Sequence, residues 1–358
     1  MTIQRNLDVA QCKTRDTISH LKQEITIAGG GLAGLALACA LRRYEVPVMV
    51  LEAGNYPRHR VCGEFISGVS EETLAALGIL PLFADALHHR SLAWFENGRL
   101  LHRDHFKDAA LGISRYLLDE RLRKLLEVTG GMIQTGVRAR PDPRDGFVWT
   151  AGRRPRKGQW LGLKAHVRIP EKSADLEMHA GENGYAGLAG VEDGWTNVCG
   201  LFRIDYQLQA SGADFLPAYL EAGGNHKLAA ALRACDWREG SFSAVAGFEL
   251  GRQIPVPGLL MLGDAESMIP PFTGNGMSMA FQAAECAIQP LLAWSQGRQS
   301  WQDAANTVRA AVIRRFRRRL AVAGTLHPVL LGSGGRSLLQ SLASARLLPF
   351  HRMLALVR

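Results

Sequence analysis

The stretch ITIAGGGLAGLALACALRR, residues 25–43, places four glycines within six positions, between a β-branched run and a run rich in alanine and leucine. Its first residues favour a short buried strand over 24–28, and the apolar residues after the glycines favour a helix over 32–43. The run PVMVLEA, residues 47–53, predicts a second buried strand. These three elements in this order predict a βαβ unit, in which two parallel strands flank a helix.

The glycine spacing inside this unit indicates what it binds. Gly29, Gly31 and Gly34 occupy the glycine positions of G-x-G-x-x-G, which permit a tight turn, close approach of a pyrophosphate, and packing of helix on strand. Glu52 ends the second strand about 20 residues further on, where a carboxylate accepts hydrogen bonds from a ribose. A tight turn alone would explain the glycines, but it would not explain the strand, helix, strand and Glu52 that accompany them at the expected spacing. The unit therefore predicts a bound dinucleotide, with its diphosphate at the helix N-terminus.

The composition is that of an ordinary globular protein. The 358 residues suffice for two domains or one elaborated domain, and 47% of them are hydrophobic and 21% charged. No run of about eighteen apolar residues marks a membrane span. Residues 1–23 lack the apolar core of a secretory signal and predict a frayed extension. The six cysteines show no paired or metal-binding spacing, which favours free thiols in a reducing cytoplasm and no metal site.

Positive charge gathers toward the end of the chain, whose net charge is +9. Residues 311–322 contain five arginines among apolar residues, and residues 337–358 again mix leucines with arginines. Basic amphipathic segments of this kind bind anionic membrane surfaces, which makes peripheral membrane contact a hypothesis here. A solvated helical face is the alternative interpretation. No nucleic-acid-binding motif accompanies the arginines, so we expect no nucleic-acid partner.

The middle of the chain has the pattern of an antiparallel sheet. Four strand-like runs fill residues 159–203, with turns at GENG and EDG. They lack intervening helices, so we expect them to form a sheet apart from the parallel one and to cover a ligand. Before them, an amphipathic helix is expected from residue 112 to the glycines at 130 and 131, followed by a strand.

A second glycine-containing motif, GDAESMIPPFTGNGMSMAFQAAECA, begins at Gly263. A buried strand ends at Asp264, a proline-containing loop follows, and residues 274–276 lead into an apolar helix. This order puts a carboxylate beside a polyol chain and a helix N-terminus beside an electron-rich group. A helix-capping aspartate is the alternative. Together with the βαβ unit, the motif predicts two turns that hold the two halves of one long dinucleotide.

Taken together, these motifs resemble a known family. GGGLAG with Glu52, the run RYLLD at 115–119, and GDAESMIPPFTGNGMSMA are similar to the FAD-dependent oxidoreductases of the para-hydroxybenzoate hydroxylase type. Within that superfamily, RHRVCGEFIS at 58–67 is most similar to the branch that contains geranylgeranyl reductases and related flavin-dependent monooxygenases. The resemblance spans residues 24–290 and implies FAD as the cofactor.

The resemblance also implies a role for each motif residue. The glycines of the βαβ unit lie at the FAD pyrophosphate, Glu52 at the adenosine ribose, Asp264 at the ribityl chain, and residues 274–277 under the isoalloxazine. The full set of FAD contacts implied in this way is Gly29, Gly31, Leu32, Ala33, Gly34, Glu52, Ala53, Arg60, Arg115, Asp264, Gly274, Asn275, Gly276 and Met277.

The predicted fold class is α/β, with a Rossmann-type FAD-binding domain of parallel strands interleaved with an antiparallel-sheet substrate domain and followed by a helical C-terminus. The predicted boundaries are an N-terminal extension, 1–23, a discontinuous FAD-binding domain, 24–73, 107–155 and 250–298, a substrate domain, 74–106 and 156–249, and a basic amphipathic helical region, 299–358.

The chain departs from the family in two places. VWTAGRRPRKGQW, residues 148–160, contains no Asp-Gly motif, and GYAGL, residues 184–188, stands where geranylgeranyl reductases have an aromatic-rich signature. GSGGRS, residues 332–337, follows leucines and is interpreted as a loop rather than as a second dinucleotide motif. We therefore expect NAD(P)H to bind transiently as a reductant.

Two reactions are compatible with this resemblance. In the favoured one, NAD(P)H reduces FAD, and a flavin C4a-hydroperoxide hydroxylates an aromatic, polyketide-like or lipophilic small molecule. In the alternative, reduced FAD reduces carbon-carbon double bonds of a prenyl lipid while a nearby acid supplies the proton. A non-catalytic electron-relay protein is a third hypothesis. The candidate catalytic residues are Cys62, Glu64 and Tyr185, with His59, Lys164 and His166 as further pocket candidates; a structural role is the alternative for each.

Overall fold

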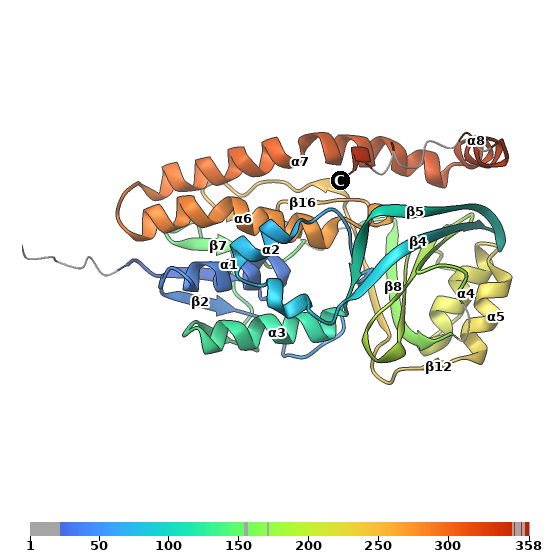
Figure 1. The fold of residues 1–358 in the computed structure, drawn as a ribbon, viewed down its shortest axis with the longest axis horizontal. Helices are drawn as coiled ribbons and strands as arrows, with labels where there is room; N and C mark the ends of the chain where they lie inside the picture. The colour runs from blue at the N-terminus through green and yellow to red at the C-terminus, as the bar shows by residue number, and fades with distance from the viewer. Residues whose placement is uncertain are drawn as a thin grey trace, which may run out of the picture.

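The computed structural model describes residues 22–153, 157–169, 172–345, 347, 352 and 355–357. In Figure 1 the described chain forms two lobes, one with helices around a small sheet and one with a larger sheet, and a long helix runs along both. Most of the predicted N-terminal extension, residues 1–21, lies outside the described residues, as does part of the basic segment 337–358.

The first lobe is built on a parallel sheet in the order β15-β7-β1-β2-β6. The sheet contains β1 Ile25–Ala28, β2 Val48–Leu51, β6 Met132–Gln134, β7 Phe147–Trp149 and β15 Leu260–Met261. β1 pairs in parallel with β2 on one side and with β7 on the other. The chain thus continues from β1 to β2 and β6 on one side, and later to β7 and β15 on the other. Ligands of open α/β sheets bind at the carboxyl ends of strands where this change of direction occurs.

The helix of the predicted βαβ unit, α1 Leu32–Arg42, is buried over almost its whole length. It packs against α6 Gly276–Ser295 and against α3 Arg115–Val128. The short helix α2 Glu71–Leu77 joins the same core through Leu74 and Leu77. The predicted parallel architecture is therefore confirmed, and the apolar character of α1 follows from its having neighbours on several sides.

The second lobe is a large, mostly antiparallel sheet in the order β12-β8-β11-β10-β9-β4-β5-β3, with β13 also paired to β8. Its strands are β3 Phe65–Ile66, β4 Leu87–Glu96, β5 Arg99–Gly112, β8 Trp160–Arg168, β9 Leu176–Ala180, β10 Gly184–Gly190, β11 Thr196–Arg203, β12 Asp236–Trp237 and β13 Ser243–Ala246. The predicted antiparallel strands between 159 and 203 thus appear as β8 to β11.

The two faces of this sheet differ in chemistry because side chains alternate along a strand. On β8, Leu163, Ala165 and Val167 pack with α4 Phe215–Ala222 and α5 His226–Ala234 in one apolar core. The intervening Lys164 and His166 are fully buried on the opposite face. That face lies toward the cofactor lobe, as the contacts of Lys164 and His166 with residues 59 and 64 show.

Helices α7 Trp301–Leu331 and α8 Ser333–Ser344 follow α6 and confirm the predicted helical C-terminus. Figure 1 shows α7 lying along α6 and continuing toward the second lobe. The interpretation of GSGGRS as a loop is wrong, because α8 begins inside it. A β-carbon added at Gly335 would overlap the carbonyl oxygen of Val329, so this glycine permits close packing of α8 on the end of α7.

The remaining described elements are short connections around the two lobes. They comprise β14 Gly251–Arg252 and β16 Ser267–Met268, which pair with each other, and the 3-10 turns η1 Leu80–Phe83, η2 Glu192–Gly194, η3 Gly212–Asp214, η4 Gly263–Ala265 and η5 Pro271–Thr273. Within the described ranges, no helix combines the length and the apolar character that crossing a bilayer requires.

Candidate functional site

The fold brings the two glycine motifs together although they lie far apart in the sequence. Strand β15 leads into η4, and a β-carbon added at Gly263 would lie 3.0 Å from the β-carbon of Ala33 at the start of α1. The next helix, α6, packs on α1. The N-terminal ends of both motif helices therefore belong to one region beside the carboxyl end of β1.

The glycines in this region divide into two kinds. A β-carbon at Gly29, where φ is +109°, would lie 2.5 Å from the backbone of Ala151, and one at Gly34 would overlap the carbonyl oxygen of Gly29. These two positions require glycine for packing. Among the described residues, the atom nearest to a β-carbon added at Gly31 would be Arg115 Nη2 at 3.9 Å, and no atom would lie within 4 Å of one added at Gly276. These two glycines thus border open space that a cofactor can fill.

Both helix N-termini at this space lack a side-chain cap. Gly31 precedes α1 and Asn275 precedes α6, and neither donates or accepts a capping hydrogen bond through a side chain. Free N–H groups at a helix start, together with the helix dipole, attract negative charge. The geometry therefore fits a dinucleotide whose diphosphate lies at α1 and whose electron-rich ring lies at α6.

Glu52 is fixed in place at the end of β2. Its Oε2 accepts a hydrogen bond from Gly30 N at 2.7 Å, and its Oε1 accepts from Gly54 N at 2.9 Å and pairs with Arg58 Nη2 at 2.6 Å. Burial opposes its ionisation, but the charge of Arg60 and these hydrogen bonds prevail and hold the pKa of the carboxyl below its usual value. The ionised carboxylate beside Gly30 is suited to accept from a ribose hydroxyl.

Two of the predicted cofactor residues are oriented by an acid that the sequence analysis did not single out. Asp119 is fully buried on α3 and pairs with Arg115 Nε at 2.7 Å and with Arg60 Nε at 2.9 Å. Arg60 Nη2 also donates to the carbonyl oxygen of Gly30 at 3.3 Å. Asp119 thus holds two guanidinium groups beside the first glycine motif. The i,i+4 spacing of Arg115 and Asp119 was the available signal.

Asp264 lies in a recess of the protein surface. Its side chain is exposed to solvent, yet surrounding protein raises the pKa of its carboxyl, against the opposing charges of Arg115 and Arg153. Asp264, Gly276 and Phe316 of α7 also line a small cavity of about 10 Å³. The predicted residues of the second motif therefore face the same region as Arg115 from the first lobe.

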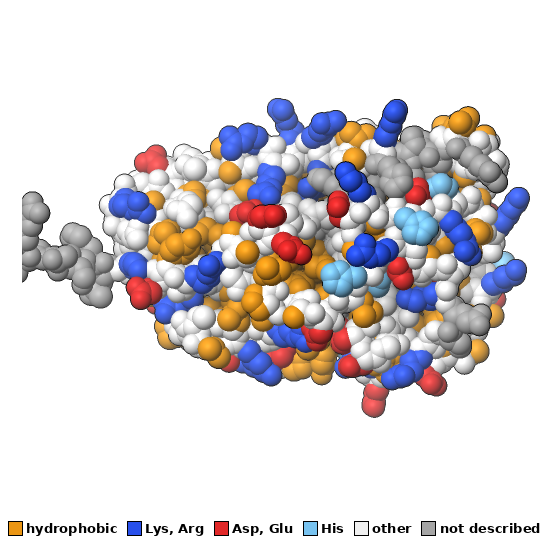
Figure 2. Space-filling model, viewed as in Figure 1, with side chains coloured by type: hydrophobic (Ala, Val, Ile, Leu, Met, Phe, Trp, Pro, Cys, Tyr) orange, Lys and Arg blue, Asp and Glu red, His pale blue; other side chains and the backbone are white. Residues whose placement is uncertain are grey.

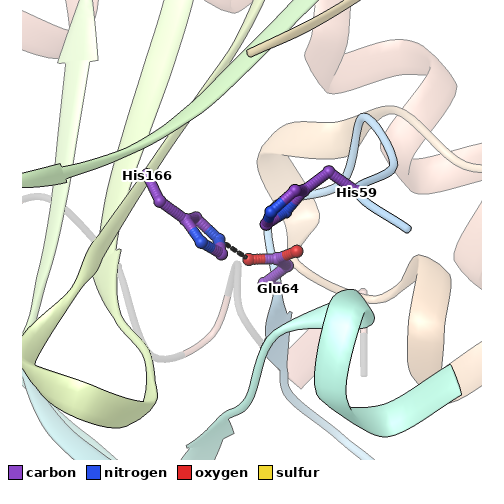
Figure 3. Close-up of side chains that lie close together, drawn as sticks. All are labelled: His59, Glu64 and His166. Carbon is purple, nitrogen blue, oxygen red and sulfur yellow. Dashed lines mark hydrogen bonds and ion pairs between the residues drawn. The ribbon is translucent and has the colours of Figure 1, made fainter. Parts of the chain in front are cut away.

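A second cluster of polar side chains lies where the two lobes meet. Glu64, Lys164 and His166 are each fully buried. In Figure 3 the rings of His59 and His166 both lie next to the Glu64 carboxylate, and a dashed line joins Glu64 to His166, whose Nε2 is 2.5 Å from Glu64 Oε2. Lys164 Nζ lies 3.3 Å from Glu64 Oε1 and 2.9 Å from His59 Nδ1. The cluster joins the 54–64 loop of the cofactor lobe to strand β8 of the sheet.

The charges in this cluster favour one arrangement of protons. Burial opposes ionisation of Glu64, but the hydrogen bond from His166 and the charge of Lys164 lower the pKa of this carboxyl. Burial and the neighbouring charges of Lys164 and His166 lower the pKa of His59 to about 3, so His59 is neutral near pH 7 and accepts from Lys164 through Nδ1. Glu64 also has φ of +52°, an uncommon backbone conformation for a residue other than glycine.

The ligand-type atoms of His59, Glu64 and His166 lie within 4.8 Å of one another, a spacing that could hold a metal ion. However, the ammonium group of Lys164 already contacts both His59 and Glu64. Adding a divalent cation would place three positive charges beside one buried carboxylate, which is unfavourable in an apolar environment. The cluster is therefore better described as an ion-pair network than as a metal centre.

The three predicted catalytic residues lie near this junction. Cys62 Sγ accepts from Glu64 N at 3.5 Å, and burial raises the pKa of the Cys62 thiol, so the thiol is protonated near neutral pH. Tyr185 on β10 accepts a hydrogen bond from Phe272 N at 3.2 Å, which connects the sheet to the second motif. Sequence reasoning missed Asn197 on β11, whose Nδ2 donates to the carbonyl oxygen of Cys62 at 2.9 Å. Alternation along β11 was the available signal for it.

An aromatic cluster connects α7 to the same region. His327 stacks on Phe272 with ring centroids 6.0 Å apart and packs against Tyr185 and Trp160. These rings belong to an apolar cluster that includes Met178 and Leu201 on the cofactor-facing side of the sheet. This side therefore has a polar part around Lys164 and His166 and an apolar part around Tyr185.

His327 makes the stability of the fold depend on pH. Burial, reinforced by the charge of Arg203, lowers its pKa to about 4. In the unfolded chain a histidine has a pKa of about 6.5. As the pH drops, the unfolded state therefore binds a proton before the folded state does. The free energy of unfolding falls as the pH decreases from about 6.5 toward 4. Replacing His327→Phe should make this decline shallower in urea unfolding at a series of pH values. An unchanged slope would contradict the lowered pKa.

Comparisons with known proteins agree with this picture. Residues 27–64 match the model of the NAD(P)-binding Rossmann-like domain. The menaquinone reductases of two Mycobacterium tuberculosis strains, CDC 1551 / Oshkosh and ATCC 25618 / H37Rv, are 29% identical to this chain over 120 residues. That match covers 32% of this chain and 29% of the reductase, so it spans less than a third of the length of these relatives.

Solved structures match over almost the whole chain. Pseudomonas aeruginosa PqsL in complex with 2-aminobenzoylacetate superposes with a TM-score of 0.68 at 16% identity, covering 88% of this chain and 99% of PqsL. The p-nitrophenol 4-monooxygenase PnpA from Pseudomonas putida DLL-E4 gives 0.70 at 14% identity, covering 94% and 97%. A variant of Klebsiella pneumoniae HpxO complexed with FAD gives 0.67 at 16% identity, covering 93% and 98%. The predicted fold class is confirmed.

Proposed function

We propose that this chain, which has the fold of FAD-dependent monooxygenases, is an FAD-dependent enzyme that hydroxylates a hydrophobic small molecule. The observation that carries the proposal is the meeting of two uncapped helix N-termini, at Gly31 and Gly276, beside open space at the carboxyl end of β1. One long dinucleotide accounts for both ends of this space, and FAD has the required diphosphate and electron-rich ring.

The residues that would hold FAD follow from their places around this space. The α1 N-terminus would bind the diphosphate, with Arg115 beside it, and Glu52 would accept from the adenosine ribose. Asp264 would accept from the ribityl chain, and the amides at the start of α6 would lie at the ring. The remaining proposed contacts are Gly29, Leu32, Ala33, Gly34, Ala53, Arg60, Gly274, Asn275 and Met277. When bound, FAD supplies the electron transfer and oxygen activation that side chains cannot.

The chain's own residues would then shape the substrate site. The sheet face that carries Tyr185 and Leu201 offers apolar surface and excludes water. Cys62, protonated because burial raises the pKa of its thiol, can donate a hydrogen bond to a bound oxygen atom. Glu64 keeps His166 and Lys164 in place beside that face. We propose NAD(P)H as a transient reductant, because the sequence has one dinucleotide motif and FAD would occupy it.

A second candidate function follows from the resemblance of residues 58–67 to the branch that contains geranylgeranyl reductases. It is the reduction of carbon-carbon double bonds in a prenyl lipid, as in geranylgeranyl reductases. The same fold and the same apolar sheet face would serve it, with a protonated group near Cys62 supplying the proton. The two candidate reactions differ in whether they require oxygen.

We also propose that the protein is cytoplasmic and contacts membranes peripherally through residues 311–322 and 337–358. The first segment lies on α7, where Arg314, Arg317 and Arg318 are exposed. Such a face attracts anionic lipid, and a lipophilic substrate would be collected there.

The experiment that separates the two reactions starts from the flavin-loaded protein, photoreduced without oxygen. Candidate phenols or polyprenyl lipids are added, and oxygen is then admitted to half of each sample. Hydroxylation predicts a product heavier by one oxygen atom in the aerated samples. Double-bond reduction predicts a product heavier by two hydrogen atoms in the anaerobic samples. Reoxidation with no product from either class would contradict both and favour an electron-relay protein.

Replacing Cys62→Ser tests the proposed role of the thiol. Serine keeps a hydrogen-bond donor but is a weaker acid than the thiol, so a proton-donating role predicts a fall in kcat of about tenfold or more with unchanged FAD content. Cys235→Ser is the matched control, because the Cys235 thiol packs in the apolar core with α4 and α5 and donates to the carbonyl oxygen of Leu232 at 3.4 Å. Equal turnover of the Cys62 variant and the wild type would remove Cys62 from the proposal.

A further inference from the structure

Helix α7 carries an unusual concentration of one charge. Residues 314–319 include five arginines around Phe316, and Asp303 is the one acidic residue of α7. Phe316 points into the core, as do Val312 and Ala323. In Figure 2, Lys and Arg side chains project from the molecule along the edge that α7 forms in Figure 1. Repulsion between these charges must be offset by solvent or by a bound anion.

Three of these arginines line a cavity. Its volume is about 550 Å³, and its walls are Arg315, Arg318, Arg319, Arg352, Ala355 and Leu356. Arg314 and Arg317 project elsewhere on the same helix and are not among the lining residues. The three arginines of α7 that line the cavity therefore lie on one side of the helix, whereas Arg314 and Arg317 lie outside the cavity.

The charges around the cavity are incompletely balanced. Arg315 pairs with Glu285 at 2.7 Å, and Arg319 Nη1 donates to Gln282 Oε1 at 2.9 Å. In the described ranges, no carboxylate forms an ion pair with Arg318 or Arg352. Four arginines thus line the cavity, and two of them, Arg318 and Arg352, have no carboxylate partner among the described residues.

The environment of Arg319 disfavours its positive charge. Its side chain is buried, and burial together with the charge of Arg315 lowers its pKa to about 10. A guanidinium group remains charged at neutral pH even so. An anion in the cavity would offset the repulsion, and arginine forks match the oxygen geometry of phosphate through paired hydrogen bonds.

We propose that this cavity is a binding site for a phosphate-bearing anion. Its volume lies within the usual range of small-molecule sites, about 300 to 1,000 Å³, and exceeds what a single small inorganic ion fills. Ala355 and Leu356 give it an apolar side, so the ligand carries a non-polar portion next to its phosphate. Two sources have this chemistry, a free organic diphosphate and the headgroup of an anionic phospholipid.

Titration calorimetry of the FAD-loaded protein with inorganic pyrophosphate tests the site, because FAD then occupies the diphosphate site proposed at α1. Arg318→Ala removes a lining guanidinium, and Arg317→Ala removes an exposed neighbour of equal charge as the matched control. We expect saturable binding of one pyrophosphate per chain, weakened about tenfold or more by Arg318→Ala and about twofold or less by Arg317→Ala. Absence of saturable binding to the wild type, or equal weakening by the two variants, would overturn the proposal.

Co-sedimentation with vesicles identifies the source of the phosphate. Phosphatidylcholine vesicles with and without phosphatidylglycerol are compared, using the same two variants. A headgroup site predicts that Arg318→Ala loses more binding to the anionic vesicles than Arg317→Ala does, and that pyrophosphate competes. A site for a free diphosphate predicts calorimetric binding without that difference. Neither readout involves turnover, so a failure of the proposed flavin chemistry would leave both results interpretable.

Discussion

Replacing Lys164 by methionine is expected to lower the free energy of unfolding by about 3–5 kcal/mol. Lys164 and Glu64 are both fully buried, with Lys164 Nζ 3.3 Å from Glu64 Oε1. Methionine has a similar volume but removes the positive charge, so the Glu64 carboxylate would remain buried without its ammonium partner. That penalty far exceeds the value of a surface ion pair, which is about 0–1 kcal/mol.

Urea unfolding of three variants measures this penalty. Lys124→Met removes an exposed lysine whose pair with Glu120 lies on α3, and it should cost less than about 1 kcal/mol. The double variant Lys164→Met with Glu64→Gln should regain part of the loss, because no buried charge is then unpaired. A Lys164→Met protein as stable as the Lys124→Met control would show that the cluster does not hold the two lobes together.

Replacing Gly31 by valine is expected to weaken FAD binding by about 100-fold while the protein still folds. The added side chain enters the open space at the start of α1, where the nearest atom is Arg115 Nη2 at 3.9 Å. The protein alone leaves room for the β-carbon, and a diphosphate at the helix N-terminus would collide with the branched side chain. Overpacking of this kind costs about 1–3 kcal/mol, and about 1.4 kcal/mol corresponds to each tenfold in affinity.

Two other glycine variants show whether the effect is specific. Gly34→Ala should destabilise the fold itself, because its β-carbon would overlap the carbonyl oxygen of Gly29. Gly324→Ala, in the middle of α7 with no described atom within 4 Å of the added carbon, should raise the free energy of unfolding by about 0.5–1 kcal/mol, because alanine favours the helix, and should leave the flavin content unchanged. Flavin fluorescence titration and thermal unfolding report the two properties separately. A Gly31→Val protein that binds FAD with wild-type affinity would contradict the proposed position of the diphosphate.

Much of the architecture follows from local sequence patterns. The β-branched run before Gly29 and the apolar run after it have distinct periodicities, and their order predicts β1, α1 and β2. The strands β8 to β11 were likewise predictable, because turn residues separate runs of alternating character. The prediction of a loop at GSGGRS was wrong because Gly335 permits close packing of α8 on α7, and local helix propensity does not reveal such packing.

The candidate site was less accessible to sequence reasoning. Lys164 and His166 could be named as pocket candidates, but their contact with Glu64 joins residues about a hundred positions apart and depends on how the lobes meet. Asp119 appeared in the sequence as part of a helix motif, and its pairing with Arg60 depends on the fold of the 54–64 loop. Tertiary structure determines which residues pair. A single sequence can therefore indicate that a residue is a candidate but not which residue it contacts.

The central claim is that the two glycine motifs hold one FAD molecule, and the flavin content of the purified, untagged protein tests it most directly. The account predicts a yellow protein whose visible absorbance corresponds to about one flavin per chain, released as FAD on denaturation. A colourless protein that stays colourless after incubation with excess FAD would contradict the claim.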